Sequence, residues 1–167
     1  CARQPPEPLR VLDIGTGSGC IAVTLALDLW NSTVTAWDIS GDALIIAREN
    51  AHRLQAHVNL ELQDALNPDE TALNAPPFDI IVSNPPYICA RESKDMAKHV
   101  LAHEPHMALF AEEDGYAVYR KIAEQAGDYL TKKGKIYLEI GYKQGDGVAE
   151  LFKKSFPQKR IRVLKDQ

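Results

Sequence analysis

The sequence Asn84-Pro85-Pro86-Tyr87 follows an apolar run at residues 78–83, and its residue types suit one kind of chemistry. A planar amide or amino nitrogen is a poor nucleophile because its lone pair is delocalised, so it must be held and polarised. The Asn84 side-chain oxygen and the Pro85 main-chain carbonyl can accept its two N–H hydrogens and offset the positive charge that develops on nitrogen. Prolines have fixed φ and no N–H donor, which keeps these acceptors aimed. The pattern favours transfer of a methyl group to such a nitrogen.

Tyr87 completes the tetrapeptide, and its ring can cover the planar group by stacking. The alternative interpretation of Asn84-Pro85-Pro86 is a proline-rich turn that ends a strand. Cys89 lies close enough to invite a nucleophile hypothesis, but no base is identifiable for it, and a small buried thiol is the simpler interpretation. Three histidines, His99, His103 and His106, are spaced like ligands on a helix. Pro105 interrupts that helix, so no metal site is expected.

A second candidate site is the sequence Gly15-Thr16-Gly17-Ser18-Gly19, which separates two apolar stretches. This order predicts a strand, a tight turn and a helix, the arrangement in which a first β–α junction binds a nucleotide. Cys20 stands where the dinucleotide fingerprint has its third glycine, which disfavours NAD without excluding it. Asp38 ends the next predicted strand, about 20 residues past the glycines, where an acidic residue meets ribose hydroxyls. The alternative is that Asp38 is a solvent-exposed strand end.

Hydrophobic periodicity predicts strands that alternate with helices. Strands are expected at residues 9–14, 33–37, 58–62, 78–83, 135–140 and 160–164. Helices are expected at residues 20–30, after Ser40 as N-cap, at 114–130 with a stop at Lys133-Gly134, and at 147–154. In the helix after Ser40, the face expected to cover the sheet is Ala43, Ile46, Ala47, Asn50, Ala51 and Leu54. This order is typical of an α/β, Rossmann-like fold with a mostly parallel twisted sheet, whose ligands bind beyond the carboxyl ends of the strands.

Length and composition bound the remaining possibilities. The chain has 167 residues, enough for one domain with a substantial core, and no linker is evident inside it. With 19 Lys+Arg and 23 Asp+Glu the formal net charge is -4, so stable nucleic-acid binding is not expected. Three cysteines without a C-x-x-C pair suit a reducing compartment, and a cytoplasmic monomer is expected. No signal peptide or span of ~18 apolar residues is recognisable, so no membrane partner is expected.

Several segments together resemble the HemK/PrmC family. They are residues 11–22, 38–40, 84–88, 104–109 and 114–116, with Gly141, Gln144 and Gly145. The glycine motif alone indicates only a class I methyltransferase, and Asn-Pro-Pro-Tyr alone is shared with adenine-N6 and some guanine-N2 methyltransferases, whereas the combination is more specific. The family consists of S-adenosylmethionine-dependent N5-glutamine methyltransferases that act on the Gly-Gly-Gln motif of peptide chain release factors. The resemblance covers nearly the whole chain and implies a single catalytic domain at residues 1–167.

The resemblance also implies a cofactor and a set of site residues. The methyl donor would be S-adenosyl-L-methionine and the product S-adenosyl-L-homocysteine, with the glycines under the methionine part, Asp38 on the ribose, and Asp64 and Ala65 beside the adenine. The implied cofactor residues are Asp13, Gly15, Thr16, Gly17, Gly19, Asp38, Ile39, Asp64, Ala65 and Asn84. The implied catalytic residues are Asn84, Pro85 and Tyr87. The implied substrate residues are Asn84, Pro85, Pro86, Tyr87 and Glu104, and the alternative for Glu104 is a loop carboxylate without a role.

Two features of that family are not found in this sequence: an N-terminal helical domain that grips the release factor, and a final strand after Lys165-Asp166. Capture of a protein substrate is therefore expected to be weakened, whereas the catalytic residues are not affected. One competing function is an amino methyltransferase acting on nucleic acid through the same Asn84. The acidic composition and the lack of an evident target-recognition insert disfavour it. The other is an inactive scaffold subunit, which would have no chemical need for Asn84-Pro85-Pro86-Tyr87.

Overall fold

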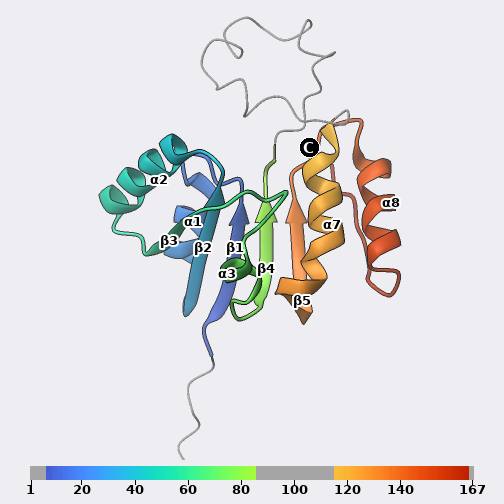
Figure 1. Cartoon of the computed structure of the whole chain (residues 1–167), viewed down its shortest axis with the longest axis horizontal. Coiled ribbons are helices and arrows are strands. Elements are labelled where there is room, and N and C mark those ends of the chain that lie inside the picture. The colour runs from blue at the N-terminus through green and yellow to red at the C-terminus, as the bar shows by residue number, and fades with distance from the viewer. Residues whose placement is uncertain (1–6, 86–114, 166–167) are drawn as a thin grey trace, which may run out of the picture. The chain divides into compact units, whose positions relative to one another are not determined.

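The computed structural model describes residues 7–85 and 115–165 of the chain. The chain divides into two compact units. The first consists of Cys1–Ser83 with Asp128–Tyr137, and the second of Asn84–Gly127 with Leu138–Gln167. Figure 1 shows the helices and strands that build them.

A five-stranded sheet in the order β3-β2-β1-β4-β5 confirms the predicted α/β fold (Figure 1). The strands are β1 (Leu9–Ile14), β2 (Ser32–Asp38), β3 (Val58–Leu62), β4 (Phe78–Ser83) and β5 (Leu130–Leu138). β1 pairs in parallel with β2 and with β4, and β2 pairs in parallel with β3. Ile14, the last residue of β1, is aligned with Trp37 of β2 and with Ser83 of β4. The carboxyl ends of these three strands therefore meet at one edge of the sheet.

Three helices belong to the first unit: α1 (Cys20–Asp28), α2 (Gly41–Leu54) and the short α3 (Glu70–Leu73). α1 packs against β1, β2, β3 and α2. Burial of apolar side chains is the main driving force for this arrangement, and the cluster between α1 and the sheet contains Val11, Ala22, Val34 and Ala36. α2 begins where sequence reasoning expected, because the Ser40 hydroxyl accepts the Ala43 N–H at 3.2 Å. Trp37 contacts the edge of the Phe78 ring with 6.3 Å between the ring centres.

The second unit contains α8 (Gly145–Ser155) and most of α7 (Ala117–Tyr129). Gln144 joins the loop before α8 to the start of α7. Its side-chain oxygen accepts the Gly141 N–H at 3.0 Å, and its side-chain amide donates to the Gly115 carbonyl at 3.4 Å. Gly147 lets Tyr116 approach α8, because a Cβ at that position would lie 2.7 Å from the Tyr116 hydroxyl. The glycine and glutamine motif of this region thus has a structural explanation within the unit.

Two predictions about the last third of the chain are wrong. β5 begins at Leu130 and passes through Gly134, where a helix stop was predicted and a strand was expected only from residue 135. A Cβ on Gly134 would lie 2.5 Å from the Leu130 side chain, so β5 bends sharply between these two residues, which a straight strand would hold about 13 Å apart. The predicted strand at residues 160–164 is irregular in the described chain. Leu164 is 83% exposed, so the alternating side chains of this segment do not form a buried face. Residues with strand propensity do not form a strand without such packing.

The buried face of α2 also differs from the predicted one. Leu44, Ala47 and Ala51 are buried, whereas Ile46 and Leu54 are about half exposed. Small residues face inward here because the helix approaches the glycine turn closely. A Cβ added to Gly19 would lie 3.0 Å from the Ala47 Cβ. The turn and α2 are therefore packed without room for a further methyl group.

Gly19→Ala is accordingly expected to lower the free energy of unfolding by about 2–4 kcal/mol, since it combines a strained backbone with overpacking. Gly19 has a φ of +80°, which L side chains rarely adopt. Gly41→Ala is the matched control, because no atom of residues 7–85 or 115–165 lies within 4 Å of a Cβ at that position and its φ is not positive. Urea unfolding of the two variants measures the difference, and equal stability would contradict the packing described here.

Candidate functional site

The glycine turn after β1 is fixed by backbone hydrogen bonds to the end of β2. The N–H groups of Gly15 and Thr16 both donate to the Trp37 carbonyl, at 2.9 and 3.0 Å. The Gly19 N–H closes the turn on the Thr16 carbonyl at 2.9 Å. The residues implied by the family resemblance in this turn are therefore held together in one rigid segment of the first unit.

Asp38 links this turn to the start of α2. One carboxylate oxygen accepts the Gly17 N–H at 2.7 Å and the other accepts the Ser40 N–H at 2.9 Å. Asp38 is half-buried, so it is not the simple exposed strand end considered from the sequence. Each carboxylate oxygen can accept more than one hydrogen bond, which leaves capacity for the hydroxyl groups of a ligand. Asp38 thus holds the turn in shape and offers acceptors at the same point.

Asp13 lies beneath the turn and is 1% exposed. Its Oδ2 accepts the Thr16 hydroxyl hydrogen at 2.7 Å, whereas its Oδ1 is buried without a hydrogen-bond partner among the described residues. Burial raises the pKa of Asp13 to about 6. The Thr16 hydroxyl and the Ala22 N–H lower this pKa, and the nearby Asp38 charge raises it. A buried acceptor without a donor is costly, and a cationic ligand group would relieve it.

The raised pKa of Asp13 predicts that stability falls as pH rises. The unfolded carboxyl ionises near pH 3.8 and the folded one near pH 6, so the stabilisation is complete below about pH 4, declines between pH 4 and 6, and is absent above. The difference is about 3 kcal/mol at neutral pH. Asp13→Asn can still accept the Thr16 hydroxyl but cannot ionise. Urea unfolding at pH 4 and pH 7.5 should show the wild type losing stability relative to this variant, and an unchanged difference would contradict the prediction.

Two further side chains fix this edge of the sheet, and sequence reasoning did not assign them to the site. Asn50 of α2 donates from its side-chain amide to the Ser18 carbonyl of the glycine turn at 2.9 Å. Ser83, the last residue of β4, donates its hydroxyl to the Ile14 carbonyl at 2.7 Å. Helical spacing had placed Asn50 on the inner face of α2, which was the available signal. Ser83 carried no such signal, because its partner is 69 residues away in the chain.

Asp64 and Ala65, predicted beside the adenine, lie after β3, and Ile39, predicted among the cofactor residues, lies after β2. The Asp64 carboxylate accepts the Leu66 N–H at 2.8 Å and so forms a turn, and Ala65 within that turn is half-buried. The preceding Gln63 N–H donates to the Asp38 carbonyl at 3.0 Å, which joins the ends of β2 and β3. Ile39 is 55% exposed. An exposed isoleucine directly after Asp38 offers an apolar surface to the flat face of a base.

Asn84 directly follows β4 and is exposed, and Pro85 is buried. Both belong to the second unit. The other predicted substrate residues, Pro86, Tyr87 and Glu104, lie outside the described residues, as do Cys89 and the three histidines considered as metal ligands. Within residues 7–85 and 115–165, no group of three or more His, Cys, Asp or Glu side chains is arranged to hold a metal ion. In the same ranges no helix has the length and apolar character needed to cross a membrane.

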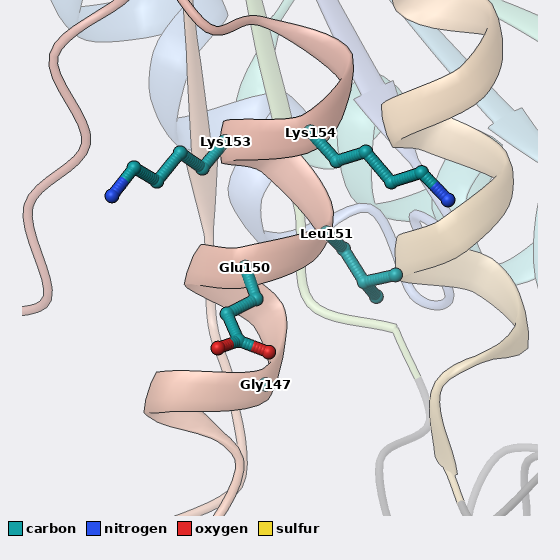
Figure 2. A pocket seen from close by; sticks show the side chains of 5 residues that line it. All are labelled: Gly147, Glu150, Leu151, Lys153 and Lys154. Carbon is teal, nitrogen blue, oxygen red and sulfur yellow. The ribbon is translucent and has the colours of Figure 1, made fainter.

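Two open pockets of about 460 Å³ each lie on helix surfaces and contain none of the predicted site residues. The pocket in Figure 2 is on α8 and is lined by Gly147, Glu150, Leu151, Lys153 and Lys154. Lys153 and Lys154 extend in opposite directions, so their charges do not converge on one ligand (Figure 2). The other pocket is on α2 and is lined by Ile45, Arg48, Glu49 and His52. Neither pocket combines the groups that the predicted chemistry requires.

The order of the strands, with a glycine turn after β1 and an acidic residue at the end of β2, defines a Rossmann-like fold. The solved ribosomal protein L11 methylase from Lactobacillus delbrueckii subsp. bulgaricus shares this fold, with a TM-score of 0.61 and 24% identity over 92% of this chain and 62% of that chain. The chain belongs to the methyltransferase small domain family, which it matches over residues 4–115.

Curated relatives confirm the narrower resemblance to the HemK/PrmC family. The release factor glutamine methyltransferase of Streptococcus pneumoniae (strain ATCC BAA-255 / R6) is 55% identical over 159 residues, covering 95% of this chain and 55% of the relative. The release factor glutamine methyltransferase of Lactococcus lactis subsp. lactis (strain IL1403) is 47% identical over 165 residues, covering 99% of this chain and 59% of the relative. The chain therefore spans a little more than half the length of these relatives.

Proposed function

We propose that this chain carries the catalytic residues of a methyltransferase that modifies the side-chain amide nitrogen, N5, of the glutamine in the Gly-Gly-Gln motif of peptide chain release factors. The observation that carries the proposal is the place of Asn84-Pro85-Pro86-Tyr87. It begins directly after β4, the neighbour of the strand that carries the glycine turn. Relatives named release factor glutamine methyltransferase, at 47% and 55% identity, support the choice of substrate.

The proposed methyl donor is S-adenosyl-L-methionine, and the residues of the first unit fit it. Among the residues that the structure describes, none lies within 4 Å of a Cβ built on Gly15 or Gly17, so these residues leave the space in front of the turn open. Asp38 would hold the ribose hydroxyls, and the unpartnered Asp13 Oδ1 suits the cationic amino group of the methionine part. When bound, the cofactor supplies an activated methyl group on a sulfonium, while the protein supplies orientation and charge complementarity.

Asn84 and Pro85 would perform the positioning of the substrate. The Asn84 side-chain oxygen and the Pro85 carbonyl accept the two N–H hydrogens of the glutamine amide, which aims the nitrogen lone pair and offsets the charge that develops on it. Pro85 is buried and has a fixed φ, so its carbonyl keeps one direction. Tyr87 would cover the planar amide by stacking. The methyl–sulfur bond would break as the methyl–nitrogen bond forms, S-adenosyl-L-homocysteine would be the leaving group, and the methylated nitrogen would release one proton to water. This chemistry needs no metal.

Methyl transfer from radiolabelled S-adenosylmethionine tests the proposal. The acceptors are a purified bacterial release factor, the same factor with the glutamine of its Gly-Gly-Gln motif replaced by alanine, and tRNA, rRNA and DNA. We expect label on the unmodified release factor alone. Label on a nucleic acid would favour an adenine-N6 or guanine-N2 methyltransferase. A short Gly-Gly-Gln peptide at high concentration is the acceptor that does not depend on capture of a whole protein, and no transfer to it or to any other acceptor would favour an inactive scaffold. Two further parts of the proposal are that the protein is a monomer and that it is cytoplasmic. Sedimentation of the purified chain tests the first, and fractionation of cells tests the second.

A further inference from the structure

The peptide between Ile14 and Gly15 is held from both sides. Its carbonyl oxygen accepts the Ser83 hydroxyl hydrogen at 2.7 Å, from β4, and its N–H donates to the Trp37 carbonyl at 2.9 Å, from β2. Ser83 is 3% exposed and Ile14 is 1% exposed, so the bond between them is shielded from water. The first peptide of the glycine turn is therefore clamped between the two neighbouring strands.

Ser83 supplies this donor one residue before the last main-chain N–H that precedes the two prolines. Ile14 and Ser83 are aligned across β1 and β4. Beyond Asn84 the chain continues with Pro85 and Pro86, which have no N–H, so main-chain pairing of β4 with β1 cannot be extended. A side-chain hydroxyl on the last residue of β4 adds a donor that the prolines cannot provide. An aliphatic residue would fill the same buried space without directing the strand end.

We propose that Ser83 is a positioning residue that fixes the end of β4, and with it the origin of Asn84, against the first peptide of the glycine turn. This inference rests on the proposed function, in which the glycine turn holds the cofactor and Asn84 holds the amide nitrogen of the substrate glutamine. Ser83 is covalently joined to Asn84, and Ile14 to Gly15, so this hydrogen bond lies one residue before each of the two segments proposed to hold the reactants. Transfer between two bound groups is sensitive to displacements of about 1 Å.

Ser83→Ala removes the hydroxyl and leaves a small side chain. We expect kcat for methylation of release factor to fall about tenfold, because the reacting groups lose alignment, while the Kd for S-adenosylmethionine changes less than about threefold. Ser83→Thr keeps the hydroxyl and should retain most of the activity. If Ser83 only stabilised the fold, its substitution would reduce the fraction of folded protein, and kcat per folded molecule would stay unchanged together with the Kd for S-adenosylmethionine.

Thr131→Val is the matched control. The Thr131 hydroxyl donates to Asp79 Oδ1 at 3.2 Å, near the beginning of β4 and away from the turn. The substitution keeps the shape of the side chain and removes one hydroxyl contact to the same strand. We expect it to lower the melting temperature by a few degrees, as Ser83→Ala does, and to leave kcat unchanged. Equal losses of kcat in both variants would overturn the proposal.

Hydrogen exchange gives a reading that does not depend on activity. Ser83→Ala should speed exchange at the carboxyl end of β4 by at least about tenfold, and Thr131→Val should not. Unchanged exchange there in Ser83→Ala, or an unchanged kcat when the wild type is active, would overturn the positioning role. Failure of the wild type to methylate release factor would instead overturn the proposed function, and the exchange result would still decide whether Ser83 fixes the end of β4.

Discussion

Asn84→Ala should lower the rate of methyl transfer by about 10²–10³, as expected when one preorganised polar group is removed from a reacting centre. The amide nitrogen of the substrate would lose the acceptor that aims its lone pair. Affinity for S-adenosylmethionine should remain largely intact, because Asn84 is only one of the ten residues implied to hold the cofactor and most of the others lie in the glycine turn and around Asp38. Single-turnover kinetics and calorimetry measure the two quantities separately.

Asn84→Asp is the sharper variant, since a carboxylate still accepts an N–H. Retained activity would point to acceptor geometry alone, whereas lost activity would mean that the neutral amide is required. Asn59→Ala is the control, because Asn59 is an exposed residue of β3 and removing its amide should change neither quantity. Wild-type activity in Asn84→Ala would mean that Asn84 only ends the strand, the alternative considered from its proline-rich sequence.

The elements that position the site were predictable because their signals are local. The apolar runs at residues 9–14, 58–62 and 78–83 are the strands β1, β3 and β4 with the predicted bounds. Each is short, apolar and followed by a turn signal, so pattern alone defines it. The glycines fixed the position of the first turn, and Ser40 fixed the start of α2. These local signals gave the carboxyl edge of the sheet and the residues that meet there.

What the sequence could not predict depends on contacts between distant residues. Ser83 and Ile14 are 69 residues apart, and Asn50 and Ser18 are 32 apart, so neither hydrogen bond has a signature in a short window. Lys133-Gly134 is a pattern typical of a helix end, so a strand that starts at Leu130 was not predicted. The contact between the Leu130 side chain and Gly134, which accompanies this early start, has no sequence signal. At residues 160–164 a strand was predicted and none forms. The alternation of apolar and polar residues there has no buried surface to pack against, since Leu164 is exposed.

Asp38→Ala is expected to weaken S-adenosylmethionine binding by about 1.5–3 kcal/mol for each charge-assisted hydrogen bond lost, or about 10- to 150-fold in Kd per bond. Two effects add. The ribose would lose its acceptor, and the Gly17 and Ser40 N–H groups would lose the carboxylate that holds them at 2.7 and 2.9 Å. The glycine turn would then become ordered only when the cofactor binds, and the free energy of this ordering would lower the affinity for S-adenosylmethionine. Calorimetry with the folded variant measures the change.

Comparison with two further variants separates these effects. Asp42→Ala removes the same charge from the exposed first turn of α2, and we expect its cofactor affinity to stay close to wild type. In Asp38→Asn, one amide oxygen can accept only one of the two backbone N–H groups, those of Gly17 and Ser40, while the side-chain NH₂ faces the other. The affinity of this variant for S-adenosylmethionine should therefore fall between those of Asp38→Ala and the wild type. An unchanged Kd in folded Asp38→Ala, or binding of NAD in place of S-adenosylmethionine, would contradict the proposed cofactor site. Equal weakening by Asp42→Ala would mean that net charge, and not the geometry at the end of β2, governs binding.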